Sequence, residues 1–465
     1  MLRSPFRLYS FVSSLWLIAV IAGNLCAATP QGTDDNAIIR DVLIIGGGAT
    51  GTYAGVRLQD QGESVVIVER NDYLGGRTHT LTVDGTPIDY GVYALFNNPV
   101  TANFLRRLSV DPKLVGRPSF ICDWVDFTTG ERALTPDGLL TTVVGAVLYR
   151  TAIQQFTSLQ NGTFHLGDPI PEELLMPFRE FVEKHALQGT LQLVLMFTQN
   201  VGNILDAPTW LVIRDFGIPH INALLSGFIS TSNGVGEVYD KAAEILDSNV
   251  LYQTTVASLT RHKTGGVSAV VQDANGKQTR IEAKKLLVTI PPTLENLEPF
   301  DLDDRETGIF RQFLHNSYYA GIVNDTGLPA RKNVANTDPH TLGGLPHTPF
   351  QWQLDYGGVP GYHTFKVIAE SGFTEQDARD LLVSDIKRMG EAGTYDTREP
   401  NFVAFESHTP ITLRPSEDAL RAGFYDDLYG LQGHRDTFYT GLAFCSDYSS
   451  LLWAYTDTVL EQLLS

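Results

Sequence analysis

The sequence predicts an α/β fold made of one strand-and-helix domain and a second, interleaved α+β domain. A buried strand, a glycine-rich turn, a helix and another buried strand follow one another between residues 41 and 68, which is the order of a β-α-β unit. Strand-like segments return only after residue 250, and 465 residues exceed one simple core. We therefore expect the first domain to be assembled from separate segments of the chain.

The first β-α-β unit is defined by its hydrophobic pattern. Residues 41–45 and 64–68 are short apolar runs rich in valine and isoleucine, as in strands buried on both faces. Residues 50–61, which lie between them, are expected to form a helix. Such a helix crosses over the sheet and makes its two flanking strands parallel.

The rest of the chain divides into two kinds of segment. Helical patterns are expected at 172–187 and 375–390, and a strand meander at 250–260, 266–272 and 279–290, with a turn at 273–276. The predicted first domain comprises residues 38–116, 235–324 and 430–465. The predicted substrate-binding domain comprises residues 117–234 and 325–429.

Composition excludes some classes of protein. Hydrophobic residues make up 43% and charged residues 19%, as in an ordinary globular enzyme. The formal net charge of −19 gives an acidic surface, which repels nucleic acid phosphates and anionic lipid headgroups. We expect a small-molecule substrate and no nucleic acid partner.

Residues 1–28 resemble a signal peptide. Arg3 and Arg7 form a basic start, residues 11–22 are apolar, and Cys26-Ala27-Ala28 is a small-residue cleavage site. The apolar run is shorter than the ~20 residues that span a bilayer, which favours cleavage over a membrane anchor. Cleavage would change the net charge from −19 to −21. We expect a secreted or secretory-pathway protein with no stable membrane span.

Two cysteines and two N-glycosylation sequons are relevant to a protein of the secretory pathway. Cys122 and Cys445 remain after cleavage, and they could form one disulfide or stay as two buried thiols. Asn161 and Asn324 each stand in an N-glycosylation sequon. The sequence thus predicts a glycoprotein and leaves the cysteine pairing open.

The glycine-rich turn Gly-Gly-Gly-Ala-Thr-Gly indicates a dinucleotide site. Gly46 permits a tight turn, Gly48 lets the backbone approach a pyrophosphate, and Gly51 lets the helix pack closely on the strand. The helix that starts near Ala49 and Thr50 directs free N–H groups and a positive dipole end at the phosphates. These residues are candidate cofactor ligands.

An acid and a second glycine pair narrow the choice of dinucleotide. Glu69 stands 18 residues after Gly51, where its carboxylate can accept hydrogen bonds from ribose hydroxyls. After Arg70, the run Gly75-Gly76-Arg77 permits a close loop and supplies a guanidinium for the cofactor. The alternatives are a chance surface glutamate and a surface-loop arginine. A nicotinamide-dependent dehydrogenase would share the first motif but not the second.

Residues 69–78, taken with the first motif, resemble the second signature of the flavin amine oxidase superfamily. The resemblance implies a Rossmann-like FAD-binding domain of the glutathione reductase/amine oxidase type, with FAD as cofactor. It also implies a strand at Val256 whose backbone pairs with adenine, and a strand at 284–290 that ends at Pro291.

The C-terminal residues 438–453 match the position of the superfamily's last flavin-contacting motif. A short strand is expected to reach Gly441, and a helix capped by Ser446 or Asp447 to begin near Ser449. In the superfamily this helix N-terminus faces the flavin, where its positive end stabilises the anionic reduced ring.

Within the superfamily, the chain is most similar to the fungal β-cyclopiazonate dehydrogenase family, through its leader and a Ser-Ser-Leu ending at 449–451. This resemblance implies an FAD-dependent oxidoreductase that transfers a hydride from a nitrogen-containing secondary metabolite, such as an indole alkaloid, to flavin N5. Oxygen or another acceptor would then take the electrons. The alternatives are an amine or amino-acid oxidase releasing hydrogen peroxide, and a binding protein that has lost catalysis.

Two departures from the superfamily pattern limit the analogy. Gly441-Leu442 stands where a Gly-Glu is usual, and residues 314–322 contain no lysine where many amine oxidases place one near flavin N5. No cysteine stands where monoamine oxidases attach their flavin, so the resemblance implies non-covalent FAD.

Tyr448 and His315 are the candidate catalytic residues. His315 could accept a proton, and Tyr448 could form an aromatic substrate wall with Phe444 and Trp453. Aromatic residues at this spacing, and a single histidine, are more often structural. The sequence predicts no metal site.

Overall fold

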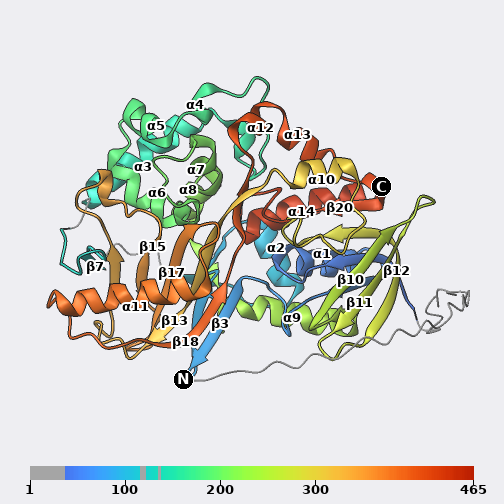
Figure 1. The fold of residues 1–465 in the computed structure, drawn as a ribbon, viewed down its shortest axis with the longest axis horizontal. Helices are drawn as coiled ribbons and strands as arrows, with labels where there is room; N and C mark the ends of the chain where they lie inside the picture. Colours follow the sequence, from blue (N-terminus) through green and yellow to red (C-terminus); the bar gives the residue numbers. More distant parts are fainter. Residues whose placement is uncertain (1–36, 116–121, 135–137) are drawn as a thin grey trace, which may run out of the picture. The chain divides into compact units, whose positions relative to one another are not determined.

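Two β-sheets, drawn from interleaved parts of the chain, carry the fold in a computed structural model of the protein (Figure 1). The structure describes residues 37–115, 122–134 and 138–465. The predicted signal peptide, residues 1–28, lies outside them and is not tested. Residues 37–465 form one compact unit, so the two-domain division stays a prediction.

The first sheet has seven strands in the order β10-β11-β12-β1-β2-β9, with β20 pairing to β12. The strands are β1 (Ile38–Ile45), β2 (Val65–Val68), β9 (Val250–Leu251), β10 (Thr254–Arg261), β11 (Val267–Asp273), β12 (Gln278–Val288) and β20 (Thr437–Tyr439). β1 is parallel to β2 and β12, while β10, β11 and β12 form an antiparallel meander. The predicted α/β class, the first β-α-β unit and the meander are confirmed.

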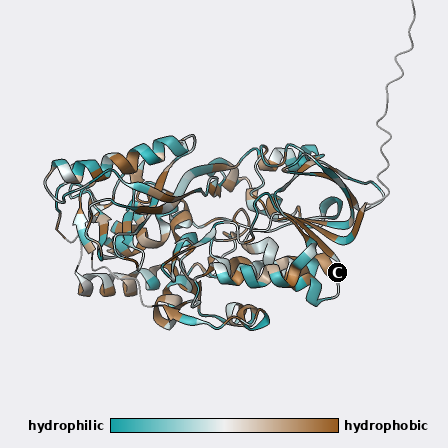
Figure 2. Ribbon diagram, turned by 90° about the horizontal axis from the view of Figure 1, so that it is seen from below, coloured by the Kyte–Doolittle hydropathy of each residue, from teal (hydrophilic) through white to brown (hydrophobic). Residues whose placement is uncertain are grey.

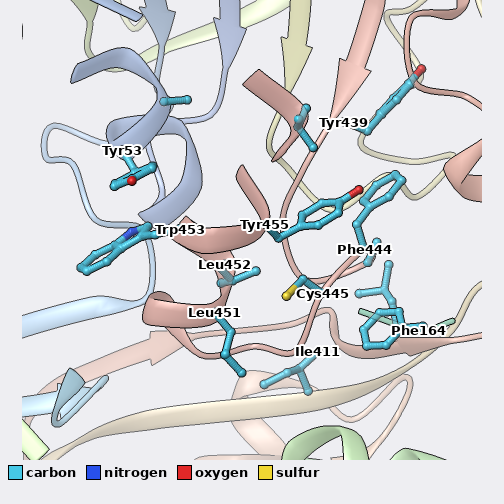
Figure 3. Packing of buried hydrophobic residues seen from close by; sticks show 14 of the residues in the cluster. Tyr53, Phe164, Ile411, Tyr439, Phe444, Cys445, Leu451, Leu452, Trp453 and Tyr455 are labelled. Carbon is cyan, nitrogen blue, oxygen red and sulfur yellow. The ribbon is translucent and has the colours of Figure 1, made fainter. Parts of the chain in front are cut away.

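The helix of the first unit, α1 (Ala49–Asp60), packs against the C-terminal helix α14 (Ser449–Leu464). The Tyr53 and Trp453 rings stack at 5.7 Å, and Trp453 Nε1 donates a hydrogen bond to the Ala49 carbonyl (Figure 3). Tyr53 also donates its hydroxyl hydrogen to Asp457, 2.8 Å away. The two ends of the described chain are thus joined in one core.

The second sheet has eight strands in the order β18-β13-β17-β16-β14-β7, with β15 pairing to β17 and β19 to β13. The strands are β7 (Cys122–Val125), β13 (Leu314–Asn324), β14 (Asn333–Asn336), β15 (Phe350–Gln351), β16 (Gln353–Tyr356), β17 (His363–Glu370), β18 (Asn401–Ser407) and β19 (Ile411–Arg414). β13 was assigned to the first domain from sequence, but it pairs within this second sheet.

Helix α11 (Glu375–Glu391) covers one face of the second sheet (Figure 1). A capping box between Thr374 and Asp377 starts the helix, and its apolar side packs Leu382 and Ile386 against Phe365 of β17. The other face is therefore left to line the interior of the protein.

A group of helices lies at the upper edge of the second sheet in Figure 1. It comprises α3 (Leu139–Ile153), α4 (Glu172–Leu175), α5 (Phe178–His185), α6 (Leu191–Thr198), α7 (Thr209–Asp215) and α8 (Ile218–Ser226). The single helix predicted at 172–187 is wrong, because Met176 is extended and Pro177 follows it. A residue that precedes proline is driven out of the helical region, which separates α4 from α5.

Shorter elements connect these parts of the fold. They are α2 (Pro99–Arg107), α9 (Gly236–Leu246), α10 (Asp304–Phe310), α12 (Glu417–Arg421), α13 (Phe424–Tyr429), the hairpin β3 (Thr78–Val83) and β4 (Thr86–Gly91), and the small sheet of β5 (Leu95–Phe96), β6 (Lys113–Val115) and β8 (Phe228–Ser230). The helices carry both hydrophobic and hydrophilic residues along their length, as amphipathic helices do (Figure 2). Among the described residues, no helix has the length and apolar character needed to cross a membrane.

The two cysteines do not form a disulfide with each other. Cys445 is fully buried near Leu451, Leu452 and Phe444 (Figure 3), and burial raises the pKa of its thiol far above the usual range. Cys122 is half-buried on β7 of the other sheet.

A buried ion-pair network connects strands β10 and β20 of the first sheet to helix α10. Arg261, at the end of β10, is completely buried and pairs with Glu306 of α10 and with Asp301, whose Oδ1 lies 2.8 Å from Nε. The Tyr439 hydroxyl donates a further hydrogen bond to Glu306, at 2.7 Å. Glu306 lies near Asp303 and His434, but these three side chains are already engaged in a helix cap and ion pairs.

We expect Arg261→Met to lower the free energy of unfolding by about 3–5 kcal/mol, because it leaves the buried Glu306 carboxylate without its main partner. The control is Arg280→Met, which removes an exposed ion pair with Glu282 and should cost less than about 1 kcal/mol. Urea denaturation followed by circular dichroism measures both, and equal losses would contradict the assignment.

Candidate cofactor and substrate site

Two cavities, of about 510 and 590 Å³, meet inside the protein. The first follows the carboxyl edge of β1 and β2, and the second lies between the second sheet and the helical group. Both are lined by Arg77, Val92, His408, Asp447 and Ser449. A ligand that fills the first cavity can therefore reach a ligand in the second.

The glycine-rich turn forms one wall of the first cavity. Gly46 has a φ of +102°, and a Cβ added at Gly51 would lie 1.9 Å from the Gly46 carbonyl oxygen. A Cβ at Gly48 would meet nothing nearer than 3.9 Å, since this glycine faces open space. The turn thus needs glycine at its two ends for packing and leaves its centre open for a ligand.

Two helices begin at this cavity. α1 starts after Gly48 and α14 starts after Tyr448, and neither first turn receives a side-chain cap. Ala49, Thr50 and Ser449, at the two starts, line the cavity. Uncapped N–H groups and two positive dipole ends suit the phosphates and ring oxygens of a dinucleotide.

Glu69 is buried at the end of β2, opposite the turn. Its Oε2 accepts a hydrogen bond from Gly47 N at 2.6 Å, and its Oε1 accepts one from Asn71 N at 2.8 Å. These bonds fix the carboxylate at the cavity wall. It can then accept further hydrogen bonds from ribose hydroxyls, which the sequence predicted.

The second glycine pair packs directly on the first motif. Gly75 N donates to the Gly47 carbonyl at 2.9 Å, and the Arg77 side chain passes between the two cavities. Its guanidinium pairs with Asp447 at 2.9 Å and donates to the Pro410 carbonyl at 2.5 Å.

The predicted cap of α14 is not formed by either candidate residue. Asp447 orients Arg77 and does not cap α14, and Ser446 donates to the Arg214 carbonyl and does not cap the helix either. The predicted cap is wrong.

Two buried polar atoms at the first cavity have no hydrogen-bond partner within the described chain. They are Thr78 Oγ1 and His408 Nε2, and each residue lines the cavity. Burial lowers the pKa of His408 well below its usual range, and lowers that of His79 to about 4. Both rings are neutral at pH 7. The unpaired atoms and the glycine walls fit a polar cofactor such as FAD.

One wall of the second cavity is the free face of the second sheet. Strand register places Lys366 of β17 opposite Ala320 of β13, and Thr364 opposite Asp355 of β16, so these residues share a face. Tyr318 and His408 extend the wall towards the first cavity. The opposite wall is apolar and aromatic, with Met196, Phe197 and Tyr448.

Comparison with known proteins identifies the family. The sequence model of the NAD(P)-binding Rossmann-like domain matches residues 44–108. The β-cyclopiazonate dehydrogenase of Aspergillus flavus is 43% identical over 92% of this chain and 94% of its own length. The chain belongs to the β-cyclopiazonate dehydrogenase family of FAD-dependent oxidoreductases. An FAD-dependent oxidoreductase of Monascus ruber is 33% identical over 92% of both chains.

Solved structures agree on the fold of this FAD-dependent oxidoreductase. The fatty acid isomerase of P. acnes superposes with a TM-score of 0.73 over 92% of this chain and 99% of its own, at 17% identity. A putrescine oxidase superposes with a TM-score of 0.62 over 92% of this chain and 100% of its own, at 14% identity. The relatives establish an enzyme with FAD as its cofactor, which sets aside the nicotinamide-dependent and binding-only alternatives.

The fold brings the predicted cofactor residues of the oxidoreductase together. All but one line the first cavity: Gly46, Gly48, Ala49, Thr50, Glu69, Arg70, Gly75, Gly76, Arg77, Val256, Gly441 and Ser449. Gly51 lies behind the turn, where its packing role was predicted. That these residues contact FAD stays a prediction.

The candidate catalytic residues are separated. Tyr448 lines the second cavity and donates its hydroxyl hydrogen to the Phe197 carbonyl at 3.0 Å. His315 stands at the start of β13 near Ser371 and is not among the residues that line either cavity. Phe444 and Trp453 are in the core and do not join the predicted aromatic wall (Figure 3).

His408 and Lys366 are the residues that sequence reasoning missed. Residues 314–322 do lack a lysine, but Lys366 reaches the cavity from the adjacent strand. The one available signal was a lysine inside the otherwise uncharged run Thr364–Ala369. No local pattern marks His408, because strand pairing alone brings it to the junction.

We expect Gly51→Ala to be purified with little or no FAD, since its Cβ would collide with the Gly46 carbonyl and displace α1 from the turn. Gly308→Ala is a matched control, because it adds a methyl group to helix α10 with nothing within 4 Å. The ratio of flavin to protein absorbance measures occupancy. Equal FAD content in both variants would refute the packing role of Gly51.

Proposed function

We propose that this FAD-dependent oxidoreductase oxidises a nitrogen-containing secondary metabolite, such as an indole alkaloid, by hydride transfer to flavin N5. The observation that carries the proposal is the junction of the two cavities at Arg77, His408 and Ser449. A substrate in the second cavity can lie against a cofactor in the first. The Aspergillus flavus relative is named for its action on β-cyclopiazonate, which supports a substrate of this kind.

The walls of the second cavity suit a planar, partly polar molecule. Tyr93, Phe197, Tyr318, Trp352 and Tyr448 supply ring faces and edges. Polar groups among them can fix the orientation of a bound ligand, as is usual in small-molecule sites. The volume of about 590 Å³ is sufficient for such a molecule.

FAD would be held non-covalently along the first cavity. The glycine turn and the start of α1 would face the pyrophosphate, and Glu69 the adenosine ribose. Neither cysteine of the described chain lines either cavity, which supports a cofactor without a thioether link.

When bound, FAD supplies the hydride acceptor, and the protein positions and shields the reacting groups. The start of α14 directs a positive dipole end at the junction, which favours a cofactor that gains negative charge. Arg77 is held rigid by Asp447 and the Pro410 carbonyl, so it keeps its place as the charge changes. The buried aromatic walls exclude water from the substrate.

Entry into the secretory pathway is part of the same proposal. It is supported by the leader pattern of residues 1–28 and by the sequons at Asn161 and Asn324. Asn161 belongs to an exposed turn, where a glycan could attach. A molecular mass that falls on deglycosylation of the protein isolated from its native source would support this location.

We expect the purified protein to be yellow, with absorption near about 450 nm that passes into the supernatant after acid precipitation. Anaerobic addition of indole alkaloids and related amines should bleach this band if one is a substrate. Re-aeration with a peroxide assay then identifies oxygen as an acceptor. Flavin that stays with the precipitate would disprove non-covalent binding, and a flavin that no such compound bleaches would disprove the substrate class.

A further inference from the structure

Lys366 is a buried cation that the fold directs into the second cavity without a partner. The residue is only 7% exposed, yet it lines the cavity from the middle of β17. It forms no hydrogen bond from its amine and no ion pair within 4 Å to any part of the described chain. An ammonium group carries three hydrogen-bond donors, and burying them without acceptors is costly.

The other charged groups of this cavity are compensated. Arg77 pairs with Asp447 at 2.9 Å, and Asp215 pairs with the buried Arg214 at 3.1 Å. Only Lys366 and Asp355, among the charged residues lining the second cavity, lack an ion pair. Asp355 accepts a hydrogen bond from Gln353 Nε2, whereas the Lys366 amine lies over two aromatic rings and has no ion pair within the described chain.

The surroundings hold the Lys366 amine in place. Its Nζ lies 4.2 Å from the centre of the Tyr93 ring and 5.5 Å from that of Trp352. Such contacts stabilise a cation modestly and leave its donors free. Burial lowers the pKa of Lys366 to about 8, and Asp355 opposes this shift, so the amine is mainly protonated at pH 7.

We propose that Lys366 binds an acidic oxygen group of the substrate, either a carboxylate or an acidic enol, at the sheet wall of the second cavity. The inference rests on the proposed function, because it assigns a chemical feature to that substrate. An anionic oxygen would give the ammonium the charge-assisted hydrogen bonds that the protein does not supply. The ring of the same substrate would lie against Tyr93 and Trp352.

Asp355 does not prevent an anion from binding. It lies on the adjacent strand, diagonal to Lys366, and burial raises the pKa of its carboxyl group. A second negative charge in the cavity would raise that pKa further, so Asp355 can take up a proton and become neutral. The pair thus adjusts its charge to the ligand.

The probes are indole-3-acetate and indole-3-acetamide, which have nearly the same shape and differ in charge. Isothermal titration of the FAD-loaded protein at pH 7 should show about 10- to 100-fold tighter binding of the acetate, the range for a hydrogen bond to a charged group. Lys366→Met should abolish the preference, and Lys366→Arg should retain it. Lys241→Met, which changes an exposed lysine paired with Glu244, should leave it unaltered.

The Asp355→Asn variant tests whether Lys366 recognises the anionic probe or serves only as the electrostatic partner of Asp355. Removal of the competing carboxylate should keep or increase the preference for the acetate. Loss of the preference in this variant would overturn the proposal, as would equal binding of both probes by the wild type, no saturable binding of either probe, or a preference retained in Lys366→Met. FAD content and bleaching are measured on the same preparations, so failure of the proposed function is detected separately.

Discussion

The close approach of backbone segments around Gly46 is the constraint on which the site depends. Gly46 ends β1, Gly51 of α1 packs on its carbonyl, and Thr289, beyond β12, donates to that carbonyl at 2.8 Å. Gly75 hydrogen-bonds to the same turn from outside. A Cβ at Gly46 or Gly51 would collide with neighbouring atoms, whereas Ala49 and Thr50 at the start of α1 line the cavity.

A second constraint acts where the two sheets meet. Arg77 comes from the N-terminal motif, Asp447 precedes the last helix, and Pro410 lies between β18 and β19 of the second sheet. The contacts that Arg77 makes with both residues join three distant parts of the chain at the junction of the cavities. His408 lies at the same place and stacks on His79 and Tyr318. Burial lowers the pKa of both imidazoles, so they are neutral at pH 7, and the Arg77–Asp447 ion pair is the charged group that the two cavities share.

The buried charged residues discussed above are of two kinds: those that form ion pairs within the fold, and Lys366, which we propose binds the substrate. Arg261 with Glu306, and Arg214 with Asp215, are buried pairs whose partners are fully present in the fold. Arg261 and Glu306 join β10 to α10, whereas Arg214 and Asp215 are neighbours in α7, and within each pair the two buried charges compensate one another. Lys366 is buried without this compensation, and its aromatic neighbours orient it without neutralising it. The second cavity therefore differs from the core in holding a buried cation with no ion pair in the described chain, which is the basis for proposing that it binds an anionic group of the substrate.

The sequence by itself determined the first β-α-β unit, the strand meander, the C-terminal helix and the glycine-rich and Glu69 walls of the first cavity. This was possible because steric demands on glycine and the hydrophobic period act over a few residues, so Gly46, Gly51 and Glu69 can be interpreted locally. Tertiary structure alone decided the second cavity. The pairing of β13 with β17 places Lys366 opposite Ala320 and so into the second cavity. Packing likewise places Phe444 and Trp453 in the core. Strand pairing brings together residues that are far apart in the chain, and the residues of one strand do not show which strand will lie beside it.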